Sequence, residues 1–258
     1  MRKKLAFLML FAVVMSTASA EGQHITVQVD GVPLSGAAVR EGITYVPLRE
    51  LMEGLGGWEL LWDGRAATAR SDLMEMTFPV GEKQLYIDGY EYAAPAAYLQ
   101  EGRTWVPLRT VAELCGAEVV WRGWSEPVEV MAGRREIRED ELYWLSRIIS
   151  AESRGESLLG QLAVGAVVLN RVEDPDYPNT IYSVIFEYNH AYQFEPVENG
   201  TVYQAPTEQS LLAARLCLNG TRVLEDCLYF FNPDLAEGTW IRENREYLTT
   251  IGCHRFYR

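Results

Sequence analysis

The chain has 258 residues, which is enough for one large or two modest domains, and its 48% hydrophobic and 23% charged residues exclude an intrinsically disordered protein. The formal net charge of −13 disfavours binding to nucleic acid and to anionic membranes. The three histidines, His24, His190 and His254, are scattered and no CxxC spacing occurs, so the sequence predicts neither a metal site nor a cofactor.

Residues 1–20 have the order of a secretory signal peptide. A basic tip at residues 2–4 precedes an apolar run, and the segment ends in Ala18-Ser19-Ala20, which matches an A-x-A cleavage site. The apolar run is too short to span a bilayer comfortably. We therefore expect a secreted protein without stable membrane insertion after cleavage.

An internal repeat occupies the next hundred residues. The stretch VDGVPL…EGITYVPLRELMEGLGG, from Val29, matches IDGYEY…EGRTWVPLRTVAELCGA, from Ile87, and the prolines of the two VPLR motifs, Pro47 and Pro107, lie 60 positions apart. Each unit predicts an extended stretch, an Asp-Gly turn, a second strand and a helix that opens at VPLR. Units this small cannot bury a core alone, so we expect one two-repeat α+β domain over residues 24–131.

The doubled pattern EGxTxVPLRxLxExLG resembles the copper amine oxidase N-terminal-like domain of secreted bacterial proteins. The resemblance implies an accessory, wall-associated scaffold, and the residues offer no copper ligands. Five of the seven tryptophans lie in this domain. Because tryptophan is usually largely buried, we expect most of them in a core or interface, with stacking on sugar rings as the alternative.

A charged linker predicted at residues 132–139 leads into a second domain at residues 140–258. Asp140 is expected to cap an amphipathic helix, ELYWLSRIISAE. The stretch SLLGQLAVGAVVLNRV predicts a buried helix that is apolar almost all round, and TEQSLLAARLCLNG predicts a third helix ending at Gly220. CLYFFNP and YLTTIGCHRFYR are expected to be extended. Four cysteines allow three disulfide pairings, among which the sequence does not choose: Cys115, Cys217, Cys227 and Cys253.

A carboxylate stands on the apolar face of the first of these helices. Leu145, Ile148 and Ile149 recur at helical spacing, and Glu152 is the next member of their stripe. Apolar neighbours and the helix C-terminus both disfavour negative charge, so this carboxyl should keep its proton to higher pH, as a general acid requires. Arg154 would oppose this effect if it points toward Glu152. The alternative is a frayed helix end with Glu152 in solvent.

Five motifs follow one another in the second domain: RIISAESRGESLLGQLAVGAVVLNRV, YPNTIYSVIF, QFEPVENG, YFFNP and IGCHRFY. Together they resemble the SleB-type cell wall hydrolases, the spore-cortex-lytic family, over residues 142–257. The resemblance implies a mainly helical, lysozyme-like domain. It also implies cleavage of peptidoglycan glycan strands between N-acetylmuramic acid and N-acetylglucosamine, largely by lytic transglycosylases, at the cell wall or spore.

The same resemblance assigns the catalytic role to Glu152, the first Glu of the A-E-x-R-G-E motif, with Ser153 where alanine is common. Gln193 and Phe194 match the family's QFS motif, whereas Glu195 does not. The residues predicted to bind substrate are Arg154, Glu156, Gln193, Phe194, Asn232, Trp240 and His254.

These residues differ in how far the sequence explains them. Gln193 could hydrogen-bond an N-acetyl group. Asn232 could bind substrate or cap a turn before Pro233. Trp240, in EGTWIREN, is expected to be an exposed loop aromatic that could stack on a sugar ring, and His254 could equally be a structural histidine.

Glycoside hydrolases usually need two carboxyls, and no second one stands on an apolar stripe. The available carboxyls are those of Glu156, Asp176, Glu187 and Glu195. One acid/base suits a lytic transglycosylase, in which the muramic acid 6-hydroxyl closes onto C1 in place of water. The alternatives are a hydrolytic muramidase, which would use Glu152 with a second carboxylate, and a non-catalytic wall-binding protein.

Overall fold

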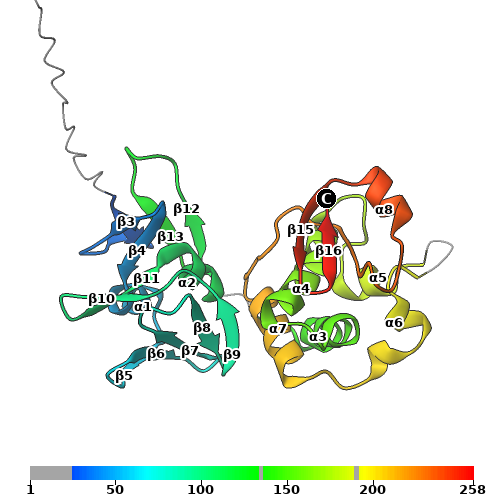
Figure 1. Ribbon diagram of the computed structural model, residues 1–258, viewed down its shortest axis with the longest axis horizontal. Coiled ribbons are helices and arrows are strands. Elements are labelled where there is room, and N and C mark those ends of the chain that lie inside the picture. The colour runs from blue at the N-terminus through cyan, green and yellow to red at the C-terminus, as the bar shows by residue number, and fades with distance from the viewer. Residues whose placement is uncertain (1–24, 134–135, 189–191) are drawn as a thin grey trace, which may run out of the picture.

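The computed structural model describes residues 25–133, 136–188 and 192–258. The signal peptide predicted at residues 1–20, and the histidines His24 and His190, lie outside these ranges. A β-rich N-terminal body and a mainly helical C-terminal body follow one another along the chain (Figure 1). This arrangement confirms the predicted α+β class.

Three sheets and two short helices build the N-terminal domain. The first sheet has the order β12 (Glu118–Val120), β13 (Val128–Met131), β1 (Val27–Val29), β2 (Val32–Pro33). The second has the order β10 (Tyr98–Gln100), β11 (Arg103–Pro107), β4 (Ile43–Pro47), β3 (Ala38–Arg40). The third runs β5 (Glu59–Trp62), β6 (Ala66–Arg70), β7 (Glu75–Pro79), β8 (Gln84–Ile87), β9 (Tyr90–Ala93). The helices are α1 (Leu48–Leu55) and α2 (Leu108–Leu114).

The sequence repeat is also a repeat in space. Both helices begin directly after the proline of VPLR, whose extended backbone ends the preceding strand. The repeats meet where β4 pairs antiparallel with β11, and Val46 lies opposite Val106, its own equivalent. The predicted Asp-Gly turns at Asp30 and Asp88 are confirmed, since both aspartates and the glycines that follow them have positive φ angles.

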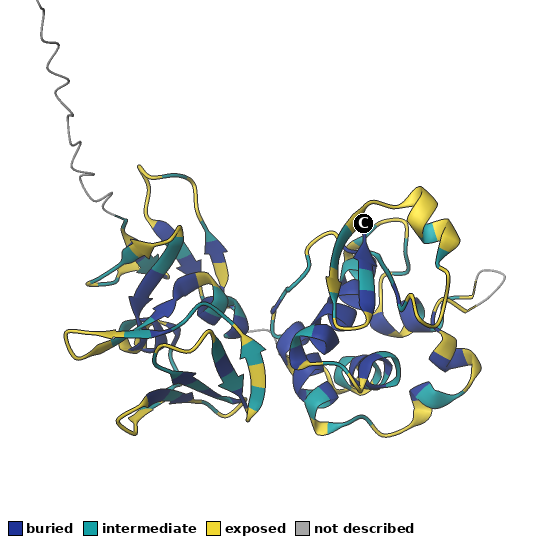
Figure 2. Cartoon of the chain, viewed as in Figure 1, coloured by how far each residue is buried: buried dark blue, intermediate teal, exposed yellow. Residues whose placement is uncertain are grey.

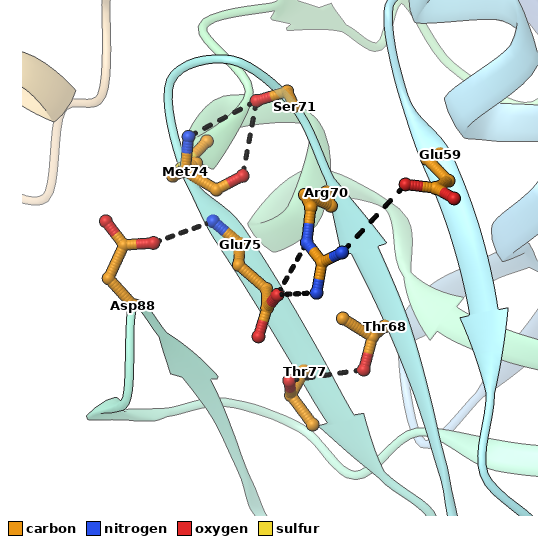
Figure 3. A network of polar contacts seen from close by, with 8 residues as sticks. All are labelled: Glu59, Thr68, Arg70, Ser71, Met74, Glu75, Thr77 and Asp88. Carbon is orange, nitrogen blue, oxygen red and sulfur yellow. Dashed lines mark hydrogen bonds and ion pairs between the residues drawn. The ribbon is translucent and has the colours of Figure 1, made fainter.

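The third sheet, which the repeat pattern did not predict, is an antiparallel meander. Its exposed face carries cross-strand polar pairs (Figure 3). Arg70 donates to the Glu75 carboxylate at 2.6 and 2.8 Å and lies 4.0 Å from Glu59, while Thr68 and Thr77 form a hydroxyl pair at 3.3 Å. Exposed pairs of this kind stabilise a sheet by only ~0.2–1 kcal/mol each, so they fix register more than stability.

The expectation that most N-domain tryptophans are buried is wrong. Trp62, Trp121 and Trp124 are 49%, 54% and 48% exposed, and only Trp58 and Trp105 are half-buried. The core is filled instead by aliphatic residues and methionines from the strands and from one face of each helix. Three of the five tryptophan rings of this domain are therefore accessible to a ligand or a partner.

The C-terminal domain is built on three helices that pack against one another, α3 (Glu139–Ser153), α4 (Leu158–Glu173) and α7 (Glu208–Leu218). Its shorter helices are α5 (Ile181–Ile185), α6 (Glu195–Glu198), η1 (Thr201–Tyr203) and α8 (Thr239–Asn244). A small sheet has the order β14 (Tyr229–Phe231), β16 (His254–Tyr257), β15 (Tyr247–Ile251). The three predicted helices are confirmed, but YLTTIGCHRFYR forms a hairpin that turns at Gly252, not a single run.

The predicted cap at Asp140 is wrong. Helix α3 begins one residue earlier, at Glu139, and no side chain caps it. Asp140 lies in the first turn and pairs with Arg138 at 2.7 Å. A carboxylate in the first turn interacts favourably with the helix dipole, so the acidic cluster stabilises this end without a cap.

Helix α4 occupies the centre of this domain, as its apolar sequence predicts (Figure 2). Gly165 allows the close approach, because a Cβ there would lie 2.8 Å from Cys217 Sγ and 2.9 Å from Ile149 Cδ1. On α3, Leu145, Ile148 and Ile149 are fully buried. The stripe that leads to Glu152 therefore does face the core.

The two domains contact one another directly. The Thr221 hydroxyl donates to the Glu113 carbonyl at 3.1 Å, and α4 packs against β9. All four cysteines are free thiols, so none of the three disulfide pairings forms. In the described part of the chain, no helix has the length and apolar character that a membrane crossing needs.

Candidate active site

A cleft of about 770 Å³ lies in the C-terminal domain at the end of α3. Its walls come from the α3–α4 turn, α4, α6, η1, the segment after β14 and the β15–β16 turn. Seven of the eight predicted site residues line it: Glu152, Arg154, Glu156, Gln193, Phe194, Asn232 and His254. Segments more than a hundred residues apart in sequence thus converge on the carboxyl that helical periodicity selected.

Glu152 lies in the last turn of α3 and is half-buried in the wall of the cleft. Burial and, to a smaller extent, the negative charge of Glu195 raise the pKa of its carboxyl from the ordinary 4.5 to about 7, against the opposing charge of Arg171. The alternative of a frayed helix end in solvent is therefore excluded. A carboxyl with this pKa is present as acid and as carboxylate in comparable amounts near neutral pH.

Arg171 is the charged partner that sequence reasoning missed. It lies in the last turn of α4 and is only 5% exposed, yet it lines the cleft. Its Nε donates to the Leu228 carbonyl at 2.8 Å, its guanidinium lies 5.2 Å from the Phe194 ring centre, and its Nη1 has no hydrogen-bond partner. Burial lowers the pKa of this guanidinium. The sequence contained a sign of this role, since a charged arginine in an otherwise apolar helix is as unusual as a glutamate on the apolar face of α3.

Arg154 does not take this role. It is exposed at the cleft edge, and its Nη2 lies 3.5 Å from Ser150 Oγ. The positive charge that lowers the pKa of Glu152 comes from Arg171, on a different helix. Position next to the glutamate in sequence did not determine which arginine faces it.

Glu195 brings a second carboxyl into the cleft. It is the first residue of α6, it is exposed, and its charge is the largest electrostatic contribution to the raised pKa of Glu152 after burial. This is the residue at which the chain departs from the QFS motif. Because Glu195 adds a second carboxyl near Glu152, the cleft holds the pair of carboxyls that glycoside hydrolysis usually needs.

Glu156 holds the β15–β16 turn in place. Its Oε1 accepts a hydrogen bond from the Cys253 backbone N–H at 3.2 Å and lies 3.7 Å from His254 Nδ1. A Cβ on Gly252 would lie 1.6 Å from Glu156 Oε2, so any other residue at that turn position would have to displace the Glu156 carboxylate. Burial lowers the pKa of His254, which keeps the imidazole neutral near pH 7 and makes this contact a weak one. Glu156 is thus a carboxylate that ties a distant hairpin to the start of α4.

The remaining predicted residues divide between cleft and support. Phe194 is 2% exposed and forms the floor, with its ring 6.4 Å from Phe230. Gln193 is exposed in the cleft. Asn232 caps a turn, since its Oδ1 accepts from the Asp234 N–H at 2.9 Å, while the residue also lines the cleft.

Trp240 is the exception among the predicted residues. It lies in α8, not in a loop, because the chain winds into a turn in which Asn244 donates to the Trp240 carbonyl at 2.9 Å. Its ring packs on Tyr229 at 6.0 Å and under Arg245 at 5.1 Å, and it is not among the residues that line the cleft. Trp240 is nevertheless 56% exposed, so the prediction of an exposed aromatic is confirmed, while its contact with a sugar ring stays a prediction.

No group of three or more His, Cys, Asp and Glu side chains in the described ranges could hold a metal ion.

Comparison with known proteins divides the chain at the same place as the fold does. The profile of a family described as Cell Wall Hydrolase matches residues 155–257, and that of the Copper amine oxidase N-terminal domain matches residues 25–130. The first match begins three residues after Glu152 and so does not include that residue.

Individual relatives match the C-terminal domain. The spore cortex-lytic enzyme of Bacillus cereus is 39% identical over 118 residues, which cover 46% of this chain and 44% of that enzyme. The cell wall hydrolase CwlJ of Bacillus subtilis is 31% identical over 121 residues, covering 44% of this chain and 82% of that protein. The solved catalytic domain of the germination-specific lytic transglycosylase SleB from Bacillus anthracis is 37% identical, with a TM-score of 0.44, and the match covers 48% of this chain and 99% of that one. The chain thus spans less than half of the length of the Bacillus cereus relative.

Proposed function

Because the chain belongs to the cell wall hydrolase family, we propose that it degrades peptidoglycan by cleaving the glycan strand at the Glu152 cleft. The observation that carries this proposal is the half-buried Glu152 carboxyl with a pKa of about 7, in a cleft large enough for sugar rings. The spore cortex-lytic relatives and the predicted signal peptide support a site of action outside the cytoplasm, at the cell wall or spore.

The reaction proposed is lytic transglycosylation with Glu152 as the one acid/base. Its carboxyl gives a proton to the glycosidic oxygen as the bond between muramic acid C1 and that oxygen breaks. The carboxylate then takes the proton of the muramic acid 6-hydroxyl while O6 bonds to C1, which closes a 1,6-anhydro ring and restores the acid. The 6-hydroxyl is tethered beside C1, so its effective concentration is high and no water has to be positioned.

Arg171 supports both halves of this cycle. Between the two proton transfers Glu152 is negative in a partly buried site, which is costly unless a positive charge lies near. Arg171 supplies that charge from a position fixed by the Leu228 carbonyl.

Glu195 favours one competing reaction, hydrolysis. A second carboxylate near the general acid is what a muramidase uses to activate water or to bind the sugar covalently. The two reactions differ in their products. Transglycosylation leaves anhydro ends that are lighter by one water and resist borohydride, whereas hydrolysis leaves reducible ends that contain an oxygen from the solvent.

The test is digestion of purified peptidoglycan in ¹⁸O-labelled water, followed by mass spectrometry of the fragments. We expect unlabelled anhydromuramic ends from the wild type, no fragments from Glu152→Gln, and the same anhydro ends from Glu195→Gln. Labelled, reducible ends that disappear in Glu195→Gln would instead establish hydrolysis with Glu195 as the second carboxylate. An active Glu152→Gln variant would remove the basis for both reactions.

A further inference from the structure

The N-terminal domain contains two apolar grooves related by its internal repeat. One groove, of about 500 Å³, is lined by Pro47-Leu48-Arg49, by β5 and by the β10–β11 hairpin. The other, of about 620 Å³, is lined by Pro107-Leu108-Arg109, by the segment after β12 and by the β3–β4 hairpin. Each groove is therefore composite, with its helix start from one repeat and its hairpin from the other.

The offset of 60 that defines the sequence repeat carries one groove onto the other. Leu99, Gly102 and Thr104 of the first groove correspond to Val39, Gly42 and Thr44 of the second. The backbone obeys the same relation, because α1 packs on β11 and α2 packs on β4, in each case the strand of the other repeat. The domain thus has a pseudo-twofold axis at the β4–β11 pair, and the two grooves are equivalent sites.

The grooves lie at opposite ends of the β4–β11 pair. Ile43, which begins β4, lines the second groove, and Arg103, which begins β11, lines the first. The antiparallel register separates these two residues by six positions along the pair, which is roughly 20 Å in ideal sheet geometry. A glycan that enters both grooves must therefore be long enough to span the strand pair.

Exposed apolar side chains concentrate at these grooves. Trp62 and Leu99 in the first groove are 49% and 51% exposed, and Trp121 and Trp124 in the second are 54% and 48% exposed. The rings of Trp121 and Trp124 meet edge to face at 5.8 Å. Large apolar side chains kept in water in both grooves favour a ligand that covers them.

The charges in the grooves are already neutralised within the domain. Arg49 lies 3.9 Å from Glu53, Arg109 lies 2.9 Å from Glu113, and Arg103 lies 3.2 Å from Glu50. A chain with a net charge of −13 also repels anionic polymers. The grooves therefore suit an uncharged ligand that is apolar on its faces and polar at its edges, as pyranose rings are.

We infer that the two grooves bind successive segments of one uncharged glycan chain, and that the N-terminal domain is a bivalent carbohydrate-binding module. A ligand that presents the same unit repeatedly matches two equivalent grooves, which a single protein surface does not. The choice of a glycan over other uncharged polymers rests in part on the proposed function. Two weak grooves on one polymer give an avidity that exceeds the affinity of either groove alone.

The test uses the full chain carrying Glu152→Gln, so that the ligand is not cut, with two probes. Short β-1,4-linked N-acetylglucosamine oligomers report single grooves by calorimetric stoichiometry, and insoluble purified peptidoglycan reports avidity by co-sedimentation. The variants are Trp62→Ala for one groove and Trp121→Ala/Trp124→Ala for the other. The matched control is Val32→Ala, because Val32 is 65% exposed in the same domain and lies in neither groove.

We expect each groove variant to lose one equivalent of the short oligomer and to bind insoluble peptidoglycan at least tenfold more weakly, while the control binds as its parent does. Circular dichroism checks that each variant is folded. Groove variants that bind peptidoglycan like the control would overturn the inference. So would a dimer of the parent chain that the tryptophan variants dissociate, since the grooves would then be an interface between copies.

Cleavage separates this inference from the proposed function. With Glu152 intact, soluble muropeptide fragments too short to reach both grooves should be cut equally by the parent and the groove variants. If no chain cuts them but the binding differences persist, the proposed function fails and the module stands. If cutting is normal and the binding differences are absent, the module fails alone.

Discussion

The substitution Glu152→Gln should stabilise the C-terminal domain at alkaline pH and leave it unchanged at acid pH. In the folded chain the pKa of the Glu152 carboxyl is about 7, against 4.5 for the same group in water. Between these two values the folded state holds a proton that the unfolded state has lost, so stability falls as the pH rises through this window. Above pH 7 the carboxylate is fully charged in its partly buried site and the whole cost is present.

The magnitude follows from the two pKa values. At ~1.4 kcal/mol for each pH unit, the difference between 4.5 and about 7 corresponds to a destabilisation of ~3.5 kcal/mol above pH 7, and to almost nothing below pH 4. A glutamine of nearly the same shape carries no charge at any pH. The variant should therefore match the wild type at pH 4 and exceed it by ~3.5 kcal/mol at pH 8.5.

The assay is urea denaturation at pH 4, 6 and 8.5, followed by far-ultraviolet circular dichroism. The three long helices all lie in the C-terminal domain, so the helical signal reports that domain. Glu243→Gln, at an exposed carboxyl of α8, is the matched control and should change stability by less than ~0.5 kcal/mol at each pH. A Glu152→Gln variant whose stability difference does not change with pH, or that is less stable at pH 8.5, would refute the account of this carboxyl.

Three further predictions concern the surroundings of the cleft. Arg171→Met removes the charge that lowers the pKa of Glu152, so the alkaline limb of the kcat/KM profile should move to higher pH, with at least a tenfold loss of rate. Arg171→Lys keeps the charge and should restore the position of the limb. A loss of rate without a shift of the limb would make Arg171 a structural residue only. Gly252→Ala, in contact with Glu156, should cost ~2–4 kcal/mol in urea denaturation, against about 1 kcal/mol for Gly200→Ala, which also has a positive φ but has open space around it. A fragment of residues 136–258 should cut soluble glycan fragments at the rate of the full chain, and a folded fragment without activity would show that the N-terminal domain takes part in the chemistry.

Local patterns in the sequence identified the elements that carry the site. Helical spacing placed Glu152 on the face of α3 that carries Leu145 and Ile149, and the structure buries that face. The uniform apolarity of α4 predicted its central place, and the 60-residue repeat predicted two equivalent units. These inferences succeed because the period of a helix and the pairing of equivalent strands are fixed by backbone geometry.

Contacts between distant segments were decided by the tertiary structure alone. The sequence offered Arg154 as the charge nearest to Glu152, but the turn after α3 leaves it in solvent and the packing of α4 brings Arg171 to the cleft instead. In the same way, Glu156 meets the turn at Gly252, nearly a hundred residues further on. The residue pattern within either segment does not predict a contact with the other segment.

Exposure was the other property that only the folded chain decided. Composition favoured buried tryptophans, yet Trp62, Trp121 and Trp124 remain in water, because the aliphatic side chains of the repeats already fill a core of this size. Trp240 is 56% exposed, as its sequence predicted, but it packs on Tyr229 and does not line the cleft. A sequence states which side chains are apolar, but the volume left inside the fold determines which of them are buried.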